Sequence, residues 1–250
     1  MTAATAITTR TARSLLGFRR VLLFGALELG PALIFLLSSA RVTTALATER
    51  ALDFAITLYF PIVVPIVAMV LASGALGGER RDSTLSFLLL KPVNRSTIAA
   101  AKIAGAVLAA VAVNTIGAVA LGGAHAITTG SSELLLPFLV GAALASTVYA
   151  AIFVPFGFLT DRAVVVGLIF VAVFENGVAA TLPGMASLSP WRIGFSAFAG
   201  LLPATTVQLV PSFALGNVTA GAGGALIKTV AVLALTIAAT TWLVRHRDLT

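Results

Sequence analysis

Long apolar stretches alternate with short polar segments along most of this sequence. Each stretch can cross about 30 Å of hydrocarbon as an α-helix. Thr160, Asp161 and Arg162 alone separate the fourth stretch from the fifth, so these two stretches are expected to form a tight helical hairpin. The pattern predicts an all-α, polytopic membrane protein. Its six predicted spans are residues 21–39, 55–76, 98–121, 135–159, 163–182 and 225–244.

The segment before the last span, residues 183–224, differs from an ordinary polar loop. It contains apolar runs at residues 195–199 and 207–210, yet prolines divide it into pieces too short to span a membrane. Short helices or a re-entrant hairpin packed against the bundle would satisfy the backbone hydrogen bonds that lipid cannot. The prolines are Pro183, Pro190, Pro203 and Pro211.

The N-terminal residues 7–20 have the pattern of an amphipathic helix at the membrane surface. Leu15 and Phe18 fall on one face together with Leu22, while neighbouring arginines can reach lipid headgroups. For the residues before Arg10, a mobile polar leader is an equal alternative.

Composition places this chain of 250 residues in lipid. It is 59% hydrophobic and only 10% charged, with a mean hydropathy of +1.06. A soluble domain of ordinary composition is about a quarter charged. The whole chain, 1–250, is therefore predicted to be a single transmembrane domain. It has no cysteine, which excludes disulfides and thiolate metal sites.

The basic residues lie between the apolar stretches, which indicates membrane topology rather than binding of nucleic acid. Twelve of the 16 fall on the side that holds both ends of the chain, and four on the other side. Because positive loops stay inside, both termini are predicted to be cytoplasmic. The twelve are Arg10, Arg13, Arg19, Arg20, Arg80, Arg81, Lys91, Arg95, Lys102, Arg162, Arg245 and Arg247; the four are Arg41, Arg50, Arg192 and Lys228.

The longest cytoplasmic connection, residues 78–96, has the pattern of a short amphipathic helix. Asp82 or Ser83 can cap its free N–H groups, and Pro92 disfavours helix at the residue before it. The leucines that share one face, at i, i+3 and i+4, are Leu85, Leu88 and Leu89.

This connection resembles the cytoplasmic stretch of ABC-2 type permeases, the membrane-spanning subunits of one class of ATP-binding-cassette transporters. It departs from the family at Ser83, where the family usually has glycine. The tail at residues 245–249, the number of spans and the apolar segment 183–224 resemble the family too. The matching residues are Glu79, Thr84, Leu85, Leu88, Leu89, Pro92, Val93, Arg95 and Lys102.

The resemblance implies that residues 79–95 form a coupling helix region that docks on a separate ATPase subunit. The alternative is a linker bound to lipid headgroups. The resemblance also implies a homodimer or heterodimer of permease subunits, export of substrate, and location in the cytoplasmic membrane of a prokaryote. The residues expected to contact or orient the ATPase are Glu79, Arg81, Thr84, Leu85, Phe87, Leu88, Leu89, Pro92 and Arg95.

Three polar residues inside the predicted spans are candidates for a transport pathway: Glu28, Asn114 and Glu175. An ionised carboxylate is costly in lipid and usually faces protein or water. For Glu28, a role in the pathway or in proton coupling stands equal to a purely structural role. For Glu175, which lies near the external end of its span, a structural role is favoured.

No catalytic or cofactor site is visible in the sequence, so ATP hydrolysis is expected on another polypeptide. Residues 223–229 contain Lys228 and Thr229 but lack the glycine that precedes the lysine of a phosphate-binding loop. The two histidines, His125 and His246, fall on opposite faces of the membrane and cannot share a metal or a catalytic triad. A membrane-embedded enzyme, a stand-alone channel or a secondary transporter remains the alternative from another class.

Overall fold

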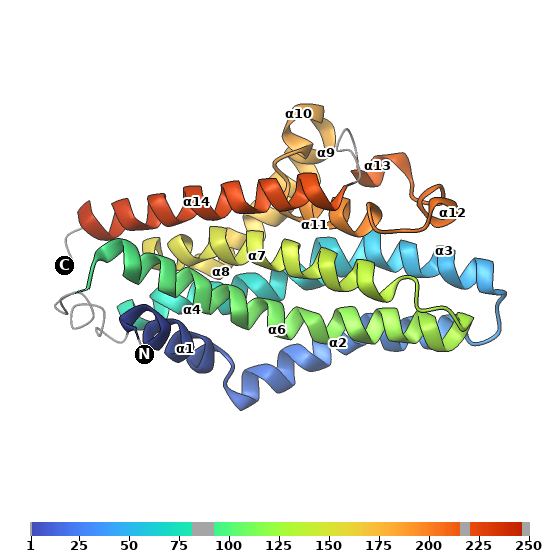
Figure 1. Cartoon of the computed structure of the whole chain (residues 1–250), viewed down its shortest axis with the longest axis horizontal. Helices are drawn as coiled ribbons and strands as arrows, with labels where there is room; N and C mark the ends of the chain where they lie inside the picture. Colours follow the sequence, from blue (N-terminus) through green and yellow to red (C-terminus); the bar gives the residue numbers. More distant parts are fainter. Residues whose placement is uncertain (1, 82–92, 216–220, 247–250) are drawn as a thin grey trace.

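The long helices run side by side along one axis, and both chain termini lie at the same end of this bundle (Figure 1). The computed structural model describes residues 2–81, 93–215 and 221–246, and within these ranges the secondary structure is helical, with no strand. We call the end that holds both termini the termini end. Within the described ranges, five helices are long and apolar enough to cross a membrane: Phe18–Ser39, Thr44–Arg81, Arg95–Thr129, Leu135–Leu159 and Ala222–His246.

These five helices correspond to five of the six predicted spans. They are α2 (Phe18–Ser39), α6 (Arg95–Thr129), α7 (Leu135–Leu159), α14 (Ala222–His246) and one continuous span built from three elements. In α6, the Asn94 side chain accepts a bond from the Ser96 N–H at 3.2 Å and so caps the first turn. Gly130 ends the helix with φ of 77°, a left-handed conformation that favours glycine.

The second span is longer than the sequence predicts. It comprises α3 (Thr44–Phe54), η1 (Ala55–Val63) and α4 (Val64–Arg81), whereas the apolar pattern placed its start at residue 55. Thr43 caps α3, and polar side chains on this extra part find partners on α6: Thr48 Oγ1 lies 3.0 Å from His125 Nε2. The helix therefore extends beyond the apolar stretch because its polar side chains find partners on a neighbouring helix.

The element η1 is a π-helix with Pro61 inside it. The Val64 N–H donates to the carbonyl of Tyr59, five residues back, instead of four. Proline has no N–H to donate, so the regular bonding pattern is interrupted here and the wider turn accommodates it.

The fifth predicted span is helical but segmented. It consists of α8 (Ala163–Ile169), the π-helix η2 (Phe170–Val178) and α9 (Ala179–Thr181). Its apolar helix Ala163–Glu175 is shorter than the five spans above. It follows α7 directly and packs on α7 and α4, as the predicted hairpin requires.

At the N-terminus, the expected single helix over residues 7–20 is wrong. Helix α1 (Ala3–Leu15) begins earlier, so the residues before Arg10 are helical. The helix is interrupted after Leu15, and α2 begins at Phe18. Leu15 is 2% exposed while Phe18 is 81% exposed, so these two side chains do not share a face. Helix α1 packs on α6, where a Cβ at Gly105 would lie 2.7 Å from Thr11 Cβ.

The segment after residue 182 contains the short helices that its prolines predict. Helix α11 is the best packed of them, with every residue buried, and Gly194 of α11 lies against Gly141 of α7. The described residues of this segment form four short helices, which lie with α9 along one side of the bundle (Figure 1). They are α10 (Pro183–Ala186), α11 (Pro190–Ala199), α12 (Ala204–Val207) and α13 (Ser212–Leu215).

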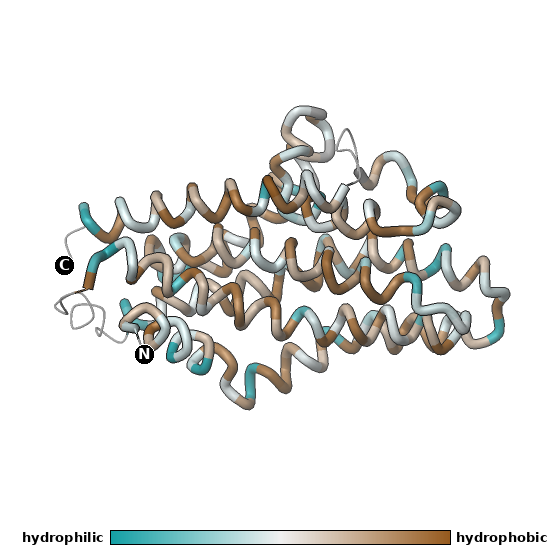
Figure 2. The backbone as a smooth tube through the Cα atoms, viewed as in Figure 1, coloured by the Kyte–Doolittle hydropathy of each residue, from teal (hydrophilic) through white to brown (hydrophobic). Residues whose placement is uncertain are grey.

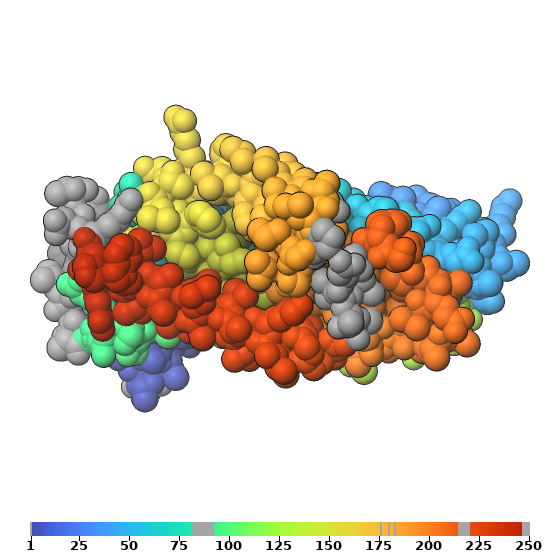
Figure 3. Space-filling view, turned by 90° about the horizontal axis from the view of Figure 1, so that it is seen from above, coloured from blue at the N-terminus to red at the C-terminus, as the bar shows by residue number. Residues whose placement is uncertain are grey.

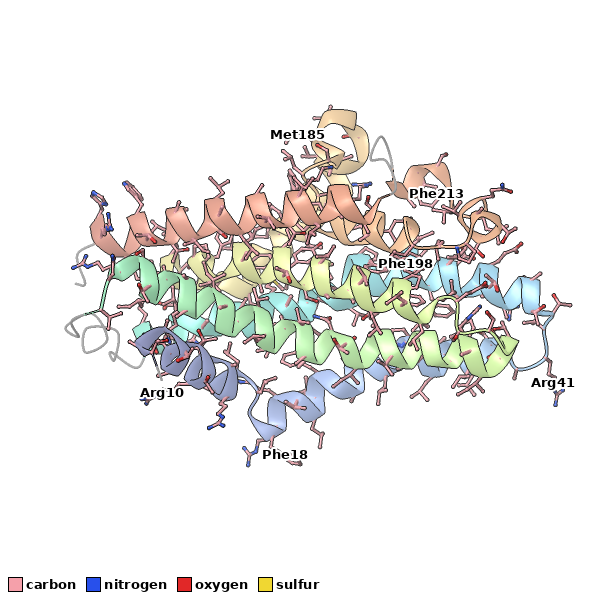
Figure 4. The ribbon with its side chains drawn as sticks, viewed as in Figure 1. Arg10, Phe18, Arg41, Met185, Phe198 and Phe213 are labelled. Carbon is pink, nitrogen blue, oxygen red and sulfur yellow. The ribbon has the colours of Figure 1, made fainter. Side chains whose placement is uncertain are left out.

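The interior is tightly packed through close helix crossings and contacts between aromatic rings. A Cβ at Gly157 of α7 would overlap the carbonyl oxygen of Ser73 on α4, so only glycine permits this approach. Phe138 of α7 and Phe198 of α11 have ring centroids 4.8 Å apart, and Figure 4 shows Phe198 between α11 and the bundle. Hydrophobic residues follow the helices, and hydrophilic residues gather mostly towards the two ends (Figure 2).

Helix α14 is the most exposed span. It lies along one face of the molecule beside the segment from α8 to α10 (Figure 3). Its exposed side chains include Leu226, Ile227, Val230, Leu235 and Trp242. Such a face suits lipid or a second membrane subunit rather than water.

Candidate functional site

The first candidate region is the termini end, where the two flanks of residues 82–92, the end of α4 and the start of α6, are bonded to each other, to α7 and to α14. At the end of α4, Arg80 Nη1 donates to the carbonyl of Phe158 at 3.0 Å, and its Nη2 lies 3.8 Å from Asp161. Glu79 forms an ion pair with Lys102 of α6, whose side chain is 5% exposed. These contacts tie the end of α4 to α6 and to the α7–α8 hairpin.

The other flank is anchored to the last helix. At the start of α6, Arg95 Nη1 donates to the carbonyl of Val244 at 2.9 Å and to that of Arg245 at 3.3 Å. Carbonyls in the last turn of a helix have no partner within the helix, and a cation there also suits the helix dipole. Arg95 therefore holds the C-terminal end of α14 against α6.

The predicted coupling residues divide between described and undescribed parts of the chain. Glu79 is half-buried, and Arg81 and Arg95 are exposed, all at the termini end. The remaining residues of that prediction, Thr84, Leu85, Phe87, Leu88, Leu89 and Pro92, lie outside the described residues.

The second candidate region is a buried polar cluster where α2, η1 and α6 meet. Glu28 and Asn114 are both 0% exposed, and neither Glu28 carboxyl oxygen has a hydrogen-bond partner among the described residues. The Tyr59 hydroxyl donates to the carbonyl of Asn114 at 2.7 Å. A Cβ at Gly117 would overlap Glu28 Oε2 and lie 2.8 Å from Tyr59 Cε2, so the carboxyl group and the phenol ring converge on this glycine.

Within this cluster, the amide of Asn114 is half satisfied. Its Nδ2 donates to the carbonyl of Ala110 at 3.0 Å, one turn back in α6, while its Oδ1 has no partner within the described ranges. The structure thus brings two of the three pathway candidates, Glu28 and Asn114, to the same helix junction.

Glu175, the third candidate, lies elsewhere and is surrounded by donors. Tyr149 of α7 donates to its Oε1 at 2.8 Å, and Ser189 donates to its Oε2. Ser189 is the residue before α11, so the carboxyl group lies at the N-terminus of that helix, where negative charge is stabilised. Glu175 therefore connects the fifth predicted span to α7 and α11.

Arg192 of α11 completes the cluster around Glu175. Its Nη1 donates to the carbonyl of Ala179 at 3.1 Å, and its guanidinium lies 4.8 Å from the centre of the Trp191 ring. Burial lowers the pKa of Arg192 from its ordinary value, and the nearby Glu175 carboxyl opposes this shift. The arginine is an electrostatic partner of Glu175 and fixes α11 to α9.

The partners of both glutamates were not predicted from the sequence. The chain has only two tyrosines; Tyr59 packs beside Glu28 and Tyr149 bonds Glu175. The rarity of a phenol in so apolar a chain was a signal that could have flagged both residues. Among the described residues, no group of three or more His, Asp and Glu side chains could hold a metal ion.

The helices and their apolar composition define the class: this is a multi-pass α-helical membrane protein. The pattern of the ABC-2 family transporter protein matches residues 19–182, which is more than half of the chain. The chain therefore belongs to the ABC-2 transporter family, as the resemblance of its sequence predicted. No curated protein matches the chain.

Proposed function

We propose that this chain is the membrane-spanning subunit of an ATP-binding-cassette exporter and that separate ATPase subunits dock on residues 79–95. The observation that carries the proposal is family membership over residues 19–182, a range that includes this segment. The anchored flanks of the segment support it. ATP hydrolysis is then the work of the partner, and this chain converts the partner's motion into movement of its helices.

The anchors suit mechanical transmission. A force on residues 82–92 acts directly on the end of α4 and the start of α6, which the Glu79–Lys102 ion pair joins. It reaches α7 through the bond of Arg80 and α14 through the bonds of Arg95. Packed helices move as rigid bodies rather than deform continuously. Motion of the docking segment would therefore shift several helices together.

The proposed topology has six spans with both termini cytoplasmic. It is supported by the shared position of the termini and by the basic residues at their end of the bundle, including Arg80 and Arg95. In this topology α10 to α13 form an external re-entrant cap that Glu175 and Arg192 hold against α7 and α9. The exposed apolar faces of α2 and α14 would contact lipid or a second permease subunit.

Glu28 and Asn114 are the polar groups that we place along the substrate pathway. They lie between α2 and α6, so a rearrangement of these helices would uncover them. Glu175 lies away from this junction, and we assign it the role of positioning α11.

Replacement of a single leucine tests the docking proposal. Leu88→Asp should release the ATPase, because one buried apolar anchor often contributes about 2 kcal/mol or more to an interface. Ile127→Asp is the matched control: Ile127 is 80% exposed, near the opposite end of α6. The tagged chain is purified from membranes of its native host, and the bound ATPase is measured per subunit. If Leu88→Asp retains as much ATPase as Ile127→Asp, the docking site lies elsewhere.

A further inference from the structure

The cluster at the α2–α6 junction has an imbalance that the proposed function does not explain. Three buried oxygens have no hydrogen-bond partner in the part of the chain that the structure describes: both carboxyl oxygens of Glu28 and Oδ1 of Asn114. All three are acceptors, and the Tyr59 hydroxyl beside them donates to a backbone carbonyl instead. Buried polar atoms are normally paired, so this cluster lacks a donor.

An ionised Glu28 would be an unpaired charge in a buried site. Within the described residues, no cation is paired with it, and Tyr59 is the only titratable side chain that faces it. A phenol cannot neutralise a carboxylate. On α2 itself the nearest basic residue is Arg20, eight residues or about 12 Å of helix rise away. On α6, Lys102 and His125 are each more than ten residues from Asn114, about 16 Å or more along the helix.

The packing also determines what can supply the missing donor. The Glu28 carboxyl group occupies the space that a side chain at Gly117 would need, and the Tyr59 ring lies against the same glycine. A proton is the one positive group that requires no additional space. A protonated carboxyl group is neutral and provides one O–H donor, so it removes the charge and part of the hydrogen-bond deficit.

Glu175 is the internal comparison. It accepts from Tyr149 and Ser189, lies at the N-terminus of α11, and has Arg192 nearby. These partners stabilise the ionised form, whereas no donor among the described residues bonds the Glu28 carboxyl group. The chain thus holds two buried glutamates, one supplied with hydrogen-bond donors and one without them.

We propose that Glu28 is a proton-binding site whose occupation depends on the contact between α2 and α6. With the helices packed, as here, Glu28 holds a proton. When α2 moves away from Gly117 and water reaches the carboxyl group, the proton is released to that water and the carboxylate is solvated. Glu28 therefore binds one proton when α2 packs on α6. This inference rests on the chain alone and does not depend on an ATPase partner.

Infrared spectroscopy of the full-length protein in lipid nanodiscs at neutral pH tests the proposal. The C=O stretch of a protonated carboxylic acid is separate from the bands of carboxylates and amides. Wild type should show this band, Glu28→Gln should lose it, and Glu175→Gln should retain it. The same pattern in heavy water, with the band shifted only after long incubation, is expected for a buried acid.

Two outcomes would overturn the proposal: wild type without the band, or Glu28→Gln with the band unchanged. Should the Gln variant not fold, Glu28→Asp provides the second test, because its shorter side chain retreats from Gly117 while it keeps the acid. The band should then move in frequency and exchange faster in heavy water. An Asp variant whose band keeps the wild-type frequency and exchange rate would place the protonated acid elsewhere.

Discussion

At the residue scale, Gly117 is a point of close approach between α2 and α6. The Glu28 carboxyl group and the Tyr59 ring share the space beside its Cα atom. Gly117→Ala should therefore destabilise the protein by about 1–3 kcal/mol, the usual cost of overpacking a core. The free energy of unfolding in detergent and denaturant measures it.

Gly123 provides the control for this change on the same helix. A Cβ there would meet nothing within 4 Å, so Gly123→Ala should be neutral or stabilising by up to about 1 kcal/mol. Equal effects of the two substitutions would mean that α2 does not pack on Gly117 as described.

Sequence reasoning at this scale identified charges but not their partners. Glu28 and Glu175 could be singled out because carboxyl groups interrupt apolar stretches. That Tyr59 and Gly117 surround the first, and Tyr149 the second, depends on which helices pair and at which depth. The apolar pattern carries little information about pairing, since all faces of these helices are similarly hydrophobic.

At the element scale, the crossing of α4 and α7 depends on Gly157. Its Cα atom lies so close to the backbone of α4 that a methyl group would overlap the Ser73 carbonyl oxygen. A backbone atom cannot move aside as a side chain can. Gly157→Ala should therefore lower the midpoint of thermal unfolding by several degrees, as about 1–3 kcal/mol implies for a chain of this size. Gly78→Ala on α4, with nothing within 4 Å, should leave that midpoint nearly unchanged.

A second prediction at this scale concerns the end of α14. Arg95→Ala removes two bonds to carbonyls of the last turn, and the expected loss is about 1 kcal/mol because the arginine is exposed. Amide hydrogen exchange in residues 241–246 should accelerate about five-fold. Arg13→Ala, an exposed change on α1, should leave this exchange rate as in wild type; acceleration by both would indicate a general loss of stability.

The apolar pattern predicted which segments are helical better than it predicted where each helix begins and ends. The span Leu135–Leu159 agrees with the prediction residue by residue. Helices α1 and α3 contain many polar residues and were missed or misplaced, because tertiary contacts with α6 stabilise them rather than burial in lipid. The interruption at η1 reflects Pro61, which a hydropathy pattern registers only as apolar.

At the scale of the whole molecule, the proposed topology can be tested by labelling, since the chain has no native cysteine. Cysteines at Ser14 and Ser86 should be shielded from an impermeant thiol reagent in intact cells. A cysteine at Ser132, exposed between α6 and α7 at the opposite end, should react. Labelling at Ser86 but not at Ser132 would invert the topology.

The central claim is that residues 79–95 bind an ATPase subunit, and site-specific photocrosslinking tests it most directly. A photoreactive amino acid replaces Phe87 in one variant and Ile127 in another, each expressed in the native host. After irradiation, adducts are purified and identified by mass spectrometry. The account predicts an adduct at position 87 with a protein that carries a phosphate-binding loop, and none at position 127. An intact complex that gives no ATPase adduct at position 87, or gives the same adduct at position 127, would contradict it.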